Sequence, residues 1–501
     1  MEHEIAIVGT GFAGLGMAIR LKEAGIDDFV LLERADHLGG TWRDNHYPGL
    51  CCDIPSHVYS YSFELNPNWT RGFAPGWEIQ DYLERTADKH DLLPHIRYGH
   101  EVLEAAWEED DGRWRLQTAG GEVTAKVLIS GAGGLSEPST PRLPGLERFQ
   151  GKSFHSADWD HDHDLAGERV AVIGTGASAI QFVPQIQPEV GRLHLFQRTP
   201  PWIMPRLDHE ITDTEHRLLR WIPFAPRLVR WVLYWLMELR VLSFRNPRLM
   251  RLGARVAKRH MARQVPDPVL RRKLTPDYVM GCKRVLVSDD YYPALAQPNV
   301  EVVTAGVREV RERSIVDAEG VEREIDTIIF GTGFVVAEPP IAHRYRGRDG
   351  RTLAEHWQGS MEAYLGSTVA GFPNLFMLVG PNTGLGHNSI VFMIESQLNY
   401  VLDCLEMMHR RGIATVEVRP EAQRRFNDEL QRASAGTVWT AGNCQSWYLD
   451  ANGRNTTLWP GWTFDFRRRT RRFDPQSYVL ANGAAPAIAG GARPDRERVG
   501  R

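Results

Sequence analysis

Two copies of one strand–glycine–helix unit constrain this chain more than any other feature. Each unit has a short apolar run, then a GxGxxG-type motif, then a stretch with helical spacing. The motif residues are Gly9, Gly11 and Gly14 in the first unit and Gly174 and Gly176 in the second, where Ala179 takes the third place. In this context the glycines let backbone amides at a helix N-terminus approach a pyrophosphate. The sequence therefore predicts an α/β fold with two Rossmann-like dinucleotide-binding domains.

The residue at the end of the second strand of each unit indicates which dinucleotide binds. Glu33 lies 24 residues after Gly9, and Arg198 lies 24 residues after Gly174. A carboxylate accepts hydrogen bonds from a free ribose diol, whereas a guanidinium pairs with a 2′-phosphate. We therefore expect FAD, with NAD as the alternative, in the first site and NADPH in the second.

The length of 501 residues allows several domains, and shifts in composition suggest where they meet. Residues 131–145 are rich in Gly, Pro and Ser, which suits a crossing between domains. Apolar and Arg residues with few strand signals predict an inserted helical subdomain. The expected division is 1–142 for the first part of the FAD domain, 143–207 for the first part of the NADP domain, 208–277 for the helical insertion, 278–376 for the second part of the NADP domain, 377–475 for the second part of the FAD domain and 476–501 for a disordered tail.

The charge balance argues against nucleic acid as a partner. Lys and Arg number 59 against 63 Asp and Glu, a net charge of -4, so no global positive field exists. The most membrane-like run, 231–239, is far shorter than the roughly 20 residues that cross a bilayer, and we expect no transmembrane segment. Residues 218–242 leave two interpretations open, a packed lid helix and an amphipathic helix on a membrane surface. The sequence favours the packed helix, and oligomeric state is not readable from it.

The cysteine pattern points to a reduced protein and to oxygen as the electron acceptor. The five cysteines are Cys51, Cys52, Cys282, Cys404 and Cys444. They form no CxxC pair and no metal-site spacing, and the N-terminus lacks a secretion signal, so a metal-free, cytoplasmic protein is expected. Disulfide reductases with two dinucleotides need a redox cysteine pair beside the flavin, where this chain has Trp42. Without such a pair, O2 becomes the expected acceptor.

One motif resembles a known family closely. Residues 149–160 read FQGKSFHSADWD, which matches the fingerprint FxGxxxHxxxW(P/D) of type I Baeyer–Villiger monooxygenases. Further similar segments, such as KR at 283–284 and FGTGF at 330–334, extend the resemblance over roughly residues 4–465. The resemblance implies an enzyme that uses FAD, NADPH and O2 to insert one oxygen next to a ketone or aldehyde carbonyl through a C4a-peroxyflavin. It also implies sulfoxidation.

The resemblance assigns roles to individual residues. It implies that Arg284 is catalytic, because a permanent cation would stabilise the peroxide and the oxyanion of the ketone adduct, and that Asp53 orients it. His155 would couple domain motion to catalysis and would not act as a base. Besides the two glycine motifs, the expected cofactor contacts are Glu33, Thr41, Trp42, Asp53, Tyr59, Val102 and Ile390 for FAD, and Ser178, Gln181, Arg198, Thr199, Lys283 and Trp447 for NADPH.

Alternatives remain at this point. A related flavin monooxygenase that oxygenates nitrogen or sulfur shares the architecture, and a flavin- and NADP-binding sensor without turnover is the alternative from another class. From the residues alone, Arg284 could instead be a surface arginine paired with Asp289 or Asp290. The segment after Ser446-Trp447-Tyr448 lacks the Pro-Gly-Lys that the resembled family carries, which leaves closure of this loop over NADP open.

Overall fold

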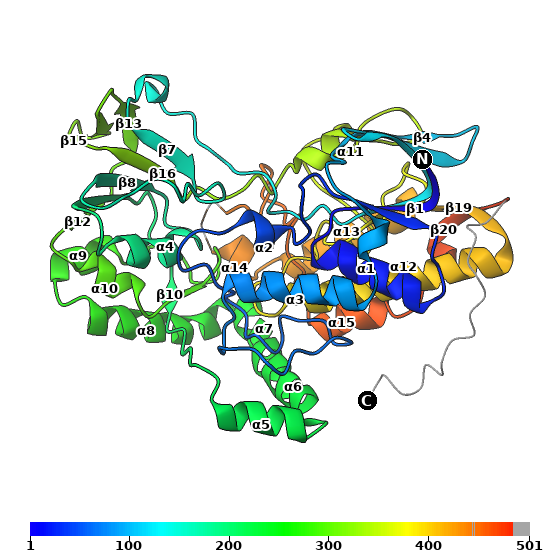
Figure 1. Cartoon of the computed structure of the whole chain (residues 1–501), viewed down its shortest axis with the longest axis horizontal. Coiled ribbons are helices and arrows are strands. Elements are labelled where there is room, and N and C mark those ends of the chain that lie inside the picture. The colour runs from blue at the N-terminus through cyan, green and yellow to red at the C-terminus, as the bar shows by residue number, and fades with distance from the viewer. Residues whose placement is uncertain (443, 445, 484–501) are drawn as a thin grey trace.

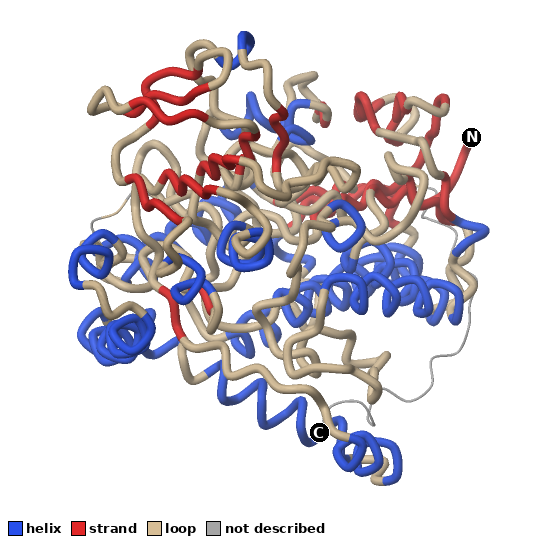
Figure 2. The backbone as a smooth tube through the Cα atoms, turned by 60° about the vertical axis from the view of Figure 1, so that its left-hand side comes forward, coloured by secondary structure: helices blue, strands red, loops and turns tan. Residues whose placement is uncertain are grey.

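The computed structural model describes residues 1–442, 444 and 446–483, and Figure 2 separates its strands into two groups joined by loops. The first group contains a sheet in the order β17-β4-β5-β6-β1-β2-β3, with β18 paired to β6. Its strands are β1 (Glu2–Val8), β2 (Phe29–Leu32), β3 (Ile96–Arg97), β4 (Val102–Glu108), β5 (Arg113–Thr118), β6 (Gly121–Ser130), β17 (Tyr345–Arg346) and β18 (Leu375–Met377). The pairing of β1 with β2 and β6 is parallel, and Ile7 lies opposite both Leu31 and Ile129. The glycine turn after β1 therefore lies at the carboxyl edge of a parallel region, where α/β sheets bind ligands.

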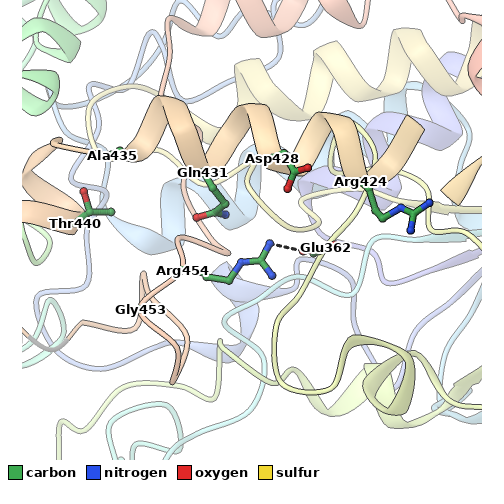
Figure 3. Close-up of a pocket in the computed structure, with 8 residues that line it drawn as sticks. All are labelled: Glu362, Arg424, Asp428, Gln431, Ala435, Thr440, Gly453 and Arg454. Carbon is green, nitrogen blue, oxygen red and sulfur yellow. Dashed lines mark hydrogen bonds and ion pairs between the residues drawn. The ribbon is translucent and has the colours of Figure 1, made fainter. Parts of the chain in front are cut away.

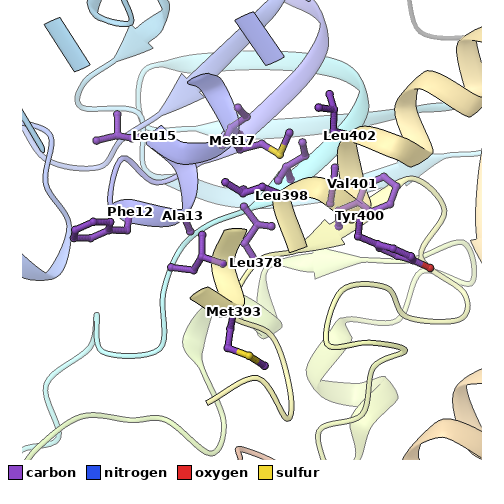
Figure 4. Close-up of a cluster of buried hydrophobic side chains, with 14 of the residues drawn as sticks. Phe12, Ala13, Leu15, Met17, Leu378, Met393, Leu398, Tyr400, Val401 and Leu402 are labelled. Atoms are coloured by element: carbon purple, nitrogen blue, oxygen red, sulfur yellow. The ribbon is translucent and has the colours of Figure 1, made fainter. Parts of the chain in front are cut away.

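Long helices cover one face of this sheet (Figure 1). They are α1 (Phe12–Glu23), α3 (Gly76–Lys89) and α12 (Ile390–Arg411). Met17 of α1 lies beside Leu398 and Leu402 of α12 in one buried cluster that also contains Leu15 (Figure 4). Burial of each such side chain contributes about 1.5–3 kcal/mol, so α12, far along the chain, holds the first glycine helix in place.

The second group contains an all-parallel sheet in the order β12-β9-β8-β16-β7. Its strands are β7 (Lys152–His155), β8 (Arg169–Ile173), β9 (Arg192–Phe196), β12 (Val300–Val303) and β16 (Thr327–Phe330), and helices α4 (Ala179–Ile186) and α10 (Tyr291–Leu295) pack beside it. Near-continuous apolar runs such as VAVI in β8 suit a sheet that is buried on both faces. The expected α/β fold with two Rossmann-like units is confirmed.

The segment predicted to be a helical insertion consists of helices. They are α5 (Asp213–Trp221), α6 (Ala225–Glu238), α7 (Val241–Arg245), α8 (Pro247–Gln264) and α9 (Pro268–Lys273). Their starts follow local capping chemistry: Thr212 and Glu215 form a capping box at α5, and the Asn246 and Asp267 side chains accept from the first amides of α8 and α9. Helices α5 and α6 project below the two sheets (Figure 1).

Two expected boundaries differ from the structure. Strands β17 and β18 fall within 278–376, assigned above to the second unit, but pair with β4 and β6 of the first sheet. The chain therefore returns to the first unit before residue 345 and not at 377. The sequence did not show this return, because strands of two or three residues leave little periodic signal. In the expected tail 476–501, β20 (Tyr478–Asn482) pairs with β19 (Ile413–Val418), and Tyr478 is buried. Residues 484–501 lie outside the described part.

The remaining elements connect these parts. They are β10 (Ile203–Met204), β11 (Leu286–Val287), β13 (Val307–Val310), β14 (Ser314–Asp317), β15 (Glu322–Glu324), α2 (Thr41–Asp44), α11 (Leu353–Trp357), α13 (Pro420–Ser434), α14 (Val438–Ala441) and α15 (Thr463–Arg469). Among the described residues, no helix combines the length and apolar character needed to cross a membrane.

Candidate functional site

A cavity of about 1140 Å³ lies where the two units meet. It exceeds the roughly 300–1,000 Å³ of a site for one small ligand. Fourteen of the sequence-predicted site residues line it: Thr41, Trp42, Asp53, Tyr59, Gly174, Gly176, Ser178, Gln181, Arg198, Thr199, Lys283, Arg284, Ile390 and Trp447. Residues from both units thus face one space, as electron transfer between two bound dinucleotides requires.

The first glycine motif has the geometry of a pyrophosphate turn. Gly9 has φ +92°, and a Cβ there would lie 2.8 Å from the carbonyl oxygen of Gly131. A Cβ on Gly14 would lie 1.9 Å from the Gly9 oxygen, so this position permits the helix to pack on the strand. A Cβ on Gly11 would meet nothing nearer than 3.8 Å. The middle glycine alone faces open space, which is where a pyrophosphate approaches the backbone. These residues fit the dinucleotide.

Five predicted FAD contacts do not line the cavity: Gly9, Gly11, Gly14, Glu33 and Val102. Glu33 is 3% exposed, and its carboxylate accepts from Thr10 Oγ1 at 2.6 Å and pairs with Arg43 at 2.9 Å. Glu33 thus stabilises the glycine turn through its hydrogen bond with Thr10. Its contact with a ribose stays a prediction. Val102 lies in β4 at 2% exposure in the core of the first sheet. The structure does not bring Val102 to the cavity, because its side chain points to the buried face of its strand.

The second glycine motif has the same turn geometry as the first, and the structure shows why Ala179 can replace its third glycine. Gly174 has φ +111°, and a Cβ there would lie 2.2 Å from the oxygen of Gly331, whereas Gly176 again faces open space. Ala179 replaces the third glycine. Its methyl group fits because the facing residue is Gly331, whose own Cβ would come within 3.2 Å of it. The replacement therefore leaves the phosphate turn intact.

Two cations lie together beside this motif. Burial lowers the pKa of Lys283, and the neighbouring Arg198 lowers it further. In the described part of the chain neither side chain forms an ion pair with a carboxylate, and both line the cavity with Thr199. Two like charges held together without a carboxylate are suited to a dianionic group, and a 2′-phosphate is one. The residues thus fit NADP and not NAD.

The predicted catalytic pair is in contact within the cavity. Arg284 donates from Nε and Nη2 to Oδ2 of Asp53, at 2.8 and 2.5 Å, although 231 residues separate them. Asp53 raises the pKa of Arg284 still further above its ordinary value, so the guanidinium is a permanent cation. The alternative partner Asp289 instead accepts from the backbone amides of Arg206 and Leu207. Arg284 therefore lies in the cavity and not on the surface.

Sequence reasoning missed a tyrosine beside this pair. Tyr448 is 1% exposed, and burial raises its pKa to about 12, while nearby Arg284 acts to lower it. Its hydroxyl lies close enough to Arg284 for that side chain to affect its pKa, but it forms no hydrogen bond of good geometry with a described residue. A buried hydroxyl without a partner is costly, so this group is available to a ligand or a water. Only its place next to Trp447 in the sequence hinted at the site.

A buried polar cluster supports the wall that Ile390 contributes. Glu238, at the end of α6, accepts from Asn388 Nδ2 at 2.6 Å and from Thr463 Oγ1 at 2.7 Å, and its carboxylate lies 3.5 Å from His387 Nε2. All four residues are at most 3% exposed. Elsewhere in the cavity lining, Trp42 Nε1 lies 3.3 Å from the Tyr59 hydroxyl. The sequence did not identify Glu238 as part of this cluster, because its partners Asn388, Thr463 and His387 lie far from it along the chain.

The fingerprint segment places the Phe154, His155 and Trp159 side chains in the interior of the second unit, while residues 150–153 are exposed. The Trp159 ring packs against Phe154 and Phe182, each at 5.2 Å between centroids. His155 is 6% exposed, its Nδ1 accepts from the Ala157 amide, and burial lowers its pKa. His155 is therefore a packed side chain, and its expected role in domain motion stays a prediction.

The cysteine expectation is wrong for two residues. Cys282 and Cys444 form a disulfide, while Cys51, Cys52 and Cys404 are free thiols. The bond joins the residue before Lys283 to the segment that carries Trp447. Residues 162 positions apart give no spacing signal, which is why the pair was missed. The cysteine pattern consequently no longer argues for a reducing compartment.

We expect Cys444→Ser to loosen the segment over the cavity and to lower stability. In the chain-entropy description, closing a loop of 162 residues contributes about 5 kcal/mol. Dithiothreitol should lower the Tm of the wild type and leave Cys444→Ser unchanged, and KM for NADPH should rise in the variant. Titration of the denatured wild type should count three free thiols; a count of five would contradict the bond.

A second hollow lies on the outer surface and carries no comparable chemistry. It is lined by Glu362, Arg424, Asp428, Gln431, Ala435, Thr440, Gly453 and Arg454 (Figure 3). Arg454 is already paired with Glu362, and none of the predicted site residues faces it. No group of three or more His, Cys, Asp or Glu side chains among the described residues is placed to hold a metal ion.

Two dinucleotide-type units that share one cavity, with a cationic pair and a permanent guanidinium in its wall, define a two-dinucleotide oxidoreductase. Residues 2–345 match the family described as "Flavin-binding monooxygenase-like", and the chain belongs to this family. Curated relatives called "Baeyer-Villiger monooxygenase", from Streptomyces coelicolor and Pseudomonas aeruginosa, are each 54% identical, over 98% and 99% of this chain and 95% of each relative. The predicted resemblance is confirmed.

Solved structures agree with these relatives. Cyclohexanone monooxygenase from Rhodococcus sp. Phi1 bound to NADP+ has a TM-score of 0.86 at 28% identity, over 96% of this chain and 100% of that chain. Oxidised steroid monooxygenase bound to NADP has a TM-score of 0.85 at 30% identity, with the same coverage. A further neighbour at TM-score 0.86, over 96% of this chain and 99% of that one, is a complex with FAD and NADP.

Proposed function

We propose that this chain is an FAD- and NADPH-dependent Baeyer–Villiger monooxygenase. It would convert a ketone or aldehyde, O2, NADPH and a proton into an ester or lactone, NADP+ and water. The observation that carries the proposal is the contact of Arg284 with Asp53 inside the cavity that the second glycine motif lines together with Trp42 and Tyr59 of the first unit. The 54% identity to relatives named for this reaction supports it. The small-molecule partners are thus a ketone and O2.

The chain's own residues would bind the two dinucleotides, orient them and stabilise negative charge on the substrate. The Gly9 and Gly174 turns would hold the two pyrophosphates, and Arg198 with Lys283 would hold the 2′-phosphate. Bound FAD supplies hydride acceptance from NADPH and activation of O2. Arg284, held by Asp53, would stabilise negative charge that develops on the substrate oxygen, an effect worth about 2.7–4 kcal/mol per donor in comparable sites. Trp42, Tyr59 and Ile390 would enclose the reacting region and exclude water.

The division of the chain follows from this assignment. Residues 1–142 and the chain from about 345 to 475 would form the FAD domain. Residues from 143 to about 335 would form the NADP domain, with the helices at 208–277 inserted. Thr41 would contact FAD, and Ser178, Gln181, Thr199 and Trp447 would contact NADPH.

A substrate screen in ¹⁸O2 tests the proposal. Cyclic, linear and aromatic ketones are incubated with the flavin-loaded enzyme and NADPH, and mass spectrometry should find one ¹⁸O atom in an ester or lactone product. If only amines or sulfides gain oxygen, the chain is a heteroatom-oxygenating flavin monooxygenase. If bound flavin is present but NADPH is not consumed with any compound, the sensor alternative holds.

A further inference from the structure

Helix α6 exposes an apolar stripe on the face that points away from the protein. Its outward residues are Leu228, Trp231, Val232, Trp235, Leu236 and, one residue past the helix end, Leu239. Steps of three and one place them on a single face of a helix. Trp231 is 60% and Leu236 57% exposed. The opposite face is the one that packs, through Met237 and Glu238. The expected packed lid helix is therefore packed on one side only.

Neighbouring elements enlarge this stripe into a projecting apolar tip. Its further members are Leu218, Trp221, Phe224, Leu242 and Phe464, and all are exposed. Trp221 is 82% exposed, and the Phe464 ring lies 5.9 Å from that of Trp235. The tip lies where α5 and α6 project from the body of the molecule (Figure 1). Soluble monomers rarely expose so many adjoining large apolar side chains without a partner for them.

Most exposed charges around the tip are positive, although Asp213 at the start of α5 is an exposed carboxylate. Between residues 216 and 266 the exposed charged residues are Arg217, Arg220, Arg227, Arg240, Arg245, Arg248, Arg251, Arg255, Lys258, Arg259 and Arg263. The only acidic residue in this span, Glu238, is buried. None of the eleven cations forms an ion pair within the described part of the chain. The chain as a whole carries -4, so this positive surface is local.

The apolar side chains and the positive charges together indicate which kind of partner covers the tip. A second copy of this chain would bring two predominantly positive surfaces together, which is unfavourable. Nucleic acid would satisfy the cations but would leave the Leu and Val side chains in water. An anionic lipid bilayer satisfies both, since Trp and Leu enter the interface and each nearby cation gains about 1 kcal/mol from the lipid charge. Because α6 has 14 residues, it would lie in the interface and not span it.

We propose that this tip docks the enzyme onto anionic lipid membranes. The inner face of α6 connects the docking surface to the site, because Glu238 holds Asn388 of the cavity wall at 2.6 Å and the Tyr234 ring stacks on Phe392 at 5.0 Å. A docked enzyme would thus hold its cavity close to compounds dissolved in the bilayer. The docking itself does not depend on which reaction the cavity performs.

Vesicle co-sedimentation of the full-length, flavin-loaded protein tests the proposal. We expect binding to vesicles that contain phosphatidylglycerol, weaker binding to phosphatidylcholine alone, and loss of binding at high salt. Trp231→Ser/Trp235→Ser should weaken binding at least about tenfold, and Arg248→Glu should weaken it about tenfold or more. Matched controls are Trp77→Ser, which removes a 65% exposed tryptophan outside the tip, and Arg313→Glu, which reverses an exposed charge in the second unit.

Measurements of folding and of activity without vesicles distinguish a loss of docking from a general loss of structure. The NADPH oxidation rate of the tip variants should equal that of the wild type, because these side chains do not line the cavity. A cooperative thermal transition should persist in each variant, with at most a small change in Tm, since Trp235 contacts the core only at its edge, at the partly buried Tyr234. Three results would overturn the proposal: equal binding by tip variants and controls, a wild-type dimer that the tryptophan variant converts to monomer without any vesicle binding, or binding of single-stranded RNA in place of vesicles. Each can occur whether or not ketones are oxidised.

Discussion

Arg284→Ala is expected to reduce ester formation at least about 100-fold while flavin reduction by NADPH continues. The variant removes the permanent cation that the structure places in the cavity, 2.5 Å from Asp53, and leaves both glycine turns unchanged. Stopped-flow absorbance measures flavin reduction, and gas chromatography measures ester. NADPH consumption in air should become uncoupled from product. Normal ester yield with Arg284→Ala would remove this residue from the mechanism.

Two further variants separate charge from position. Arg284→Lys keeps the charge but cannot form the two-nitrogen contact with Asp53, so partial activity is expected. Asp53→Asn keeps a hydrogen-bond acceptor but removes the countercharge, and we expect lower ester yield with smaller losses than in Arg284→Ala. If Asp53→Asn were as inactive as Arg284→Ala with normal flavin content, Asp53 would itself act in the chemistry.

Arg198→Ala is expected to lower kcat/KM for NADPH about 10- to 100-fold and to leave that for NADH nearly unchanged. A charge-assisted hydrogen bond contributes roughly 1.5–3 kcal/mol, and Arg198 and Lys283 form the cationic pair beside the second motif. Lys283→Ala in the same background should remove most of the remaining preference. Initial rates with both nucleotides measure the effect.

A surface arginine in the same unit is the matched control. Arg308 is half exposed and lies outside the cavity, so Arg308→Ala should change neither rate. Equal losses with NADPH and NADH in Arg198→Ala would mean that Arg198 supports the fold of the site and does not contact the 2′-phosphate.

The parts of the site that could be predicted from the sequence depend on local patterns. A glycine turn between a strand and a helix is set by a few neighbouring residues, so both turns and the Glu33–Arg198 contrast were readable. The Arg284–Asp53 contact joins residues 231 positions apart and could be expected only through the family resemblance. The partners of Glu33 and the burial of Val102 depend on packing, which no local pattern encodes.

The features that sequence reasoning missed share a physical cause. The Cys282–Cys444 bond, the Glu238–Asn388 contact and the return of β17 to the first sheet all join distant segments. The sequence showed that α6 is rich in apolar residues, but it did not show which of them are buried. A helix that is apolar on both sides can be buried or half exposed. Only the positions of its neighbours decide this.

The disulfide has a consequence for how the two units can move. Cys282 lies in the second unit, and the chain between it and Cys444 passes through β17, β18 and α12 of the first unit before it returns. The bond therefore closes a covalent ring that includes parts of both units and passes beside Arg284. Any movement of one unit against the other must keep the segment around Cys444 attached to the residue that precedes Lys283 and Arg284.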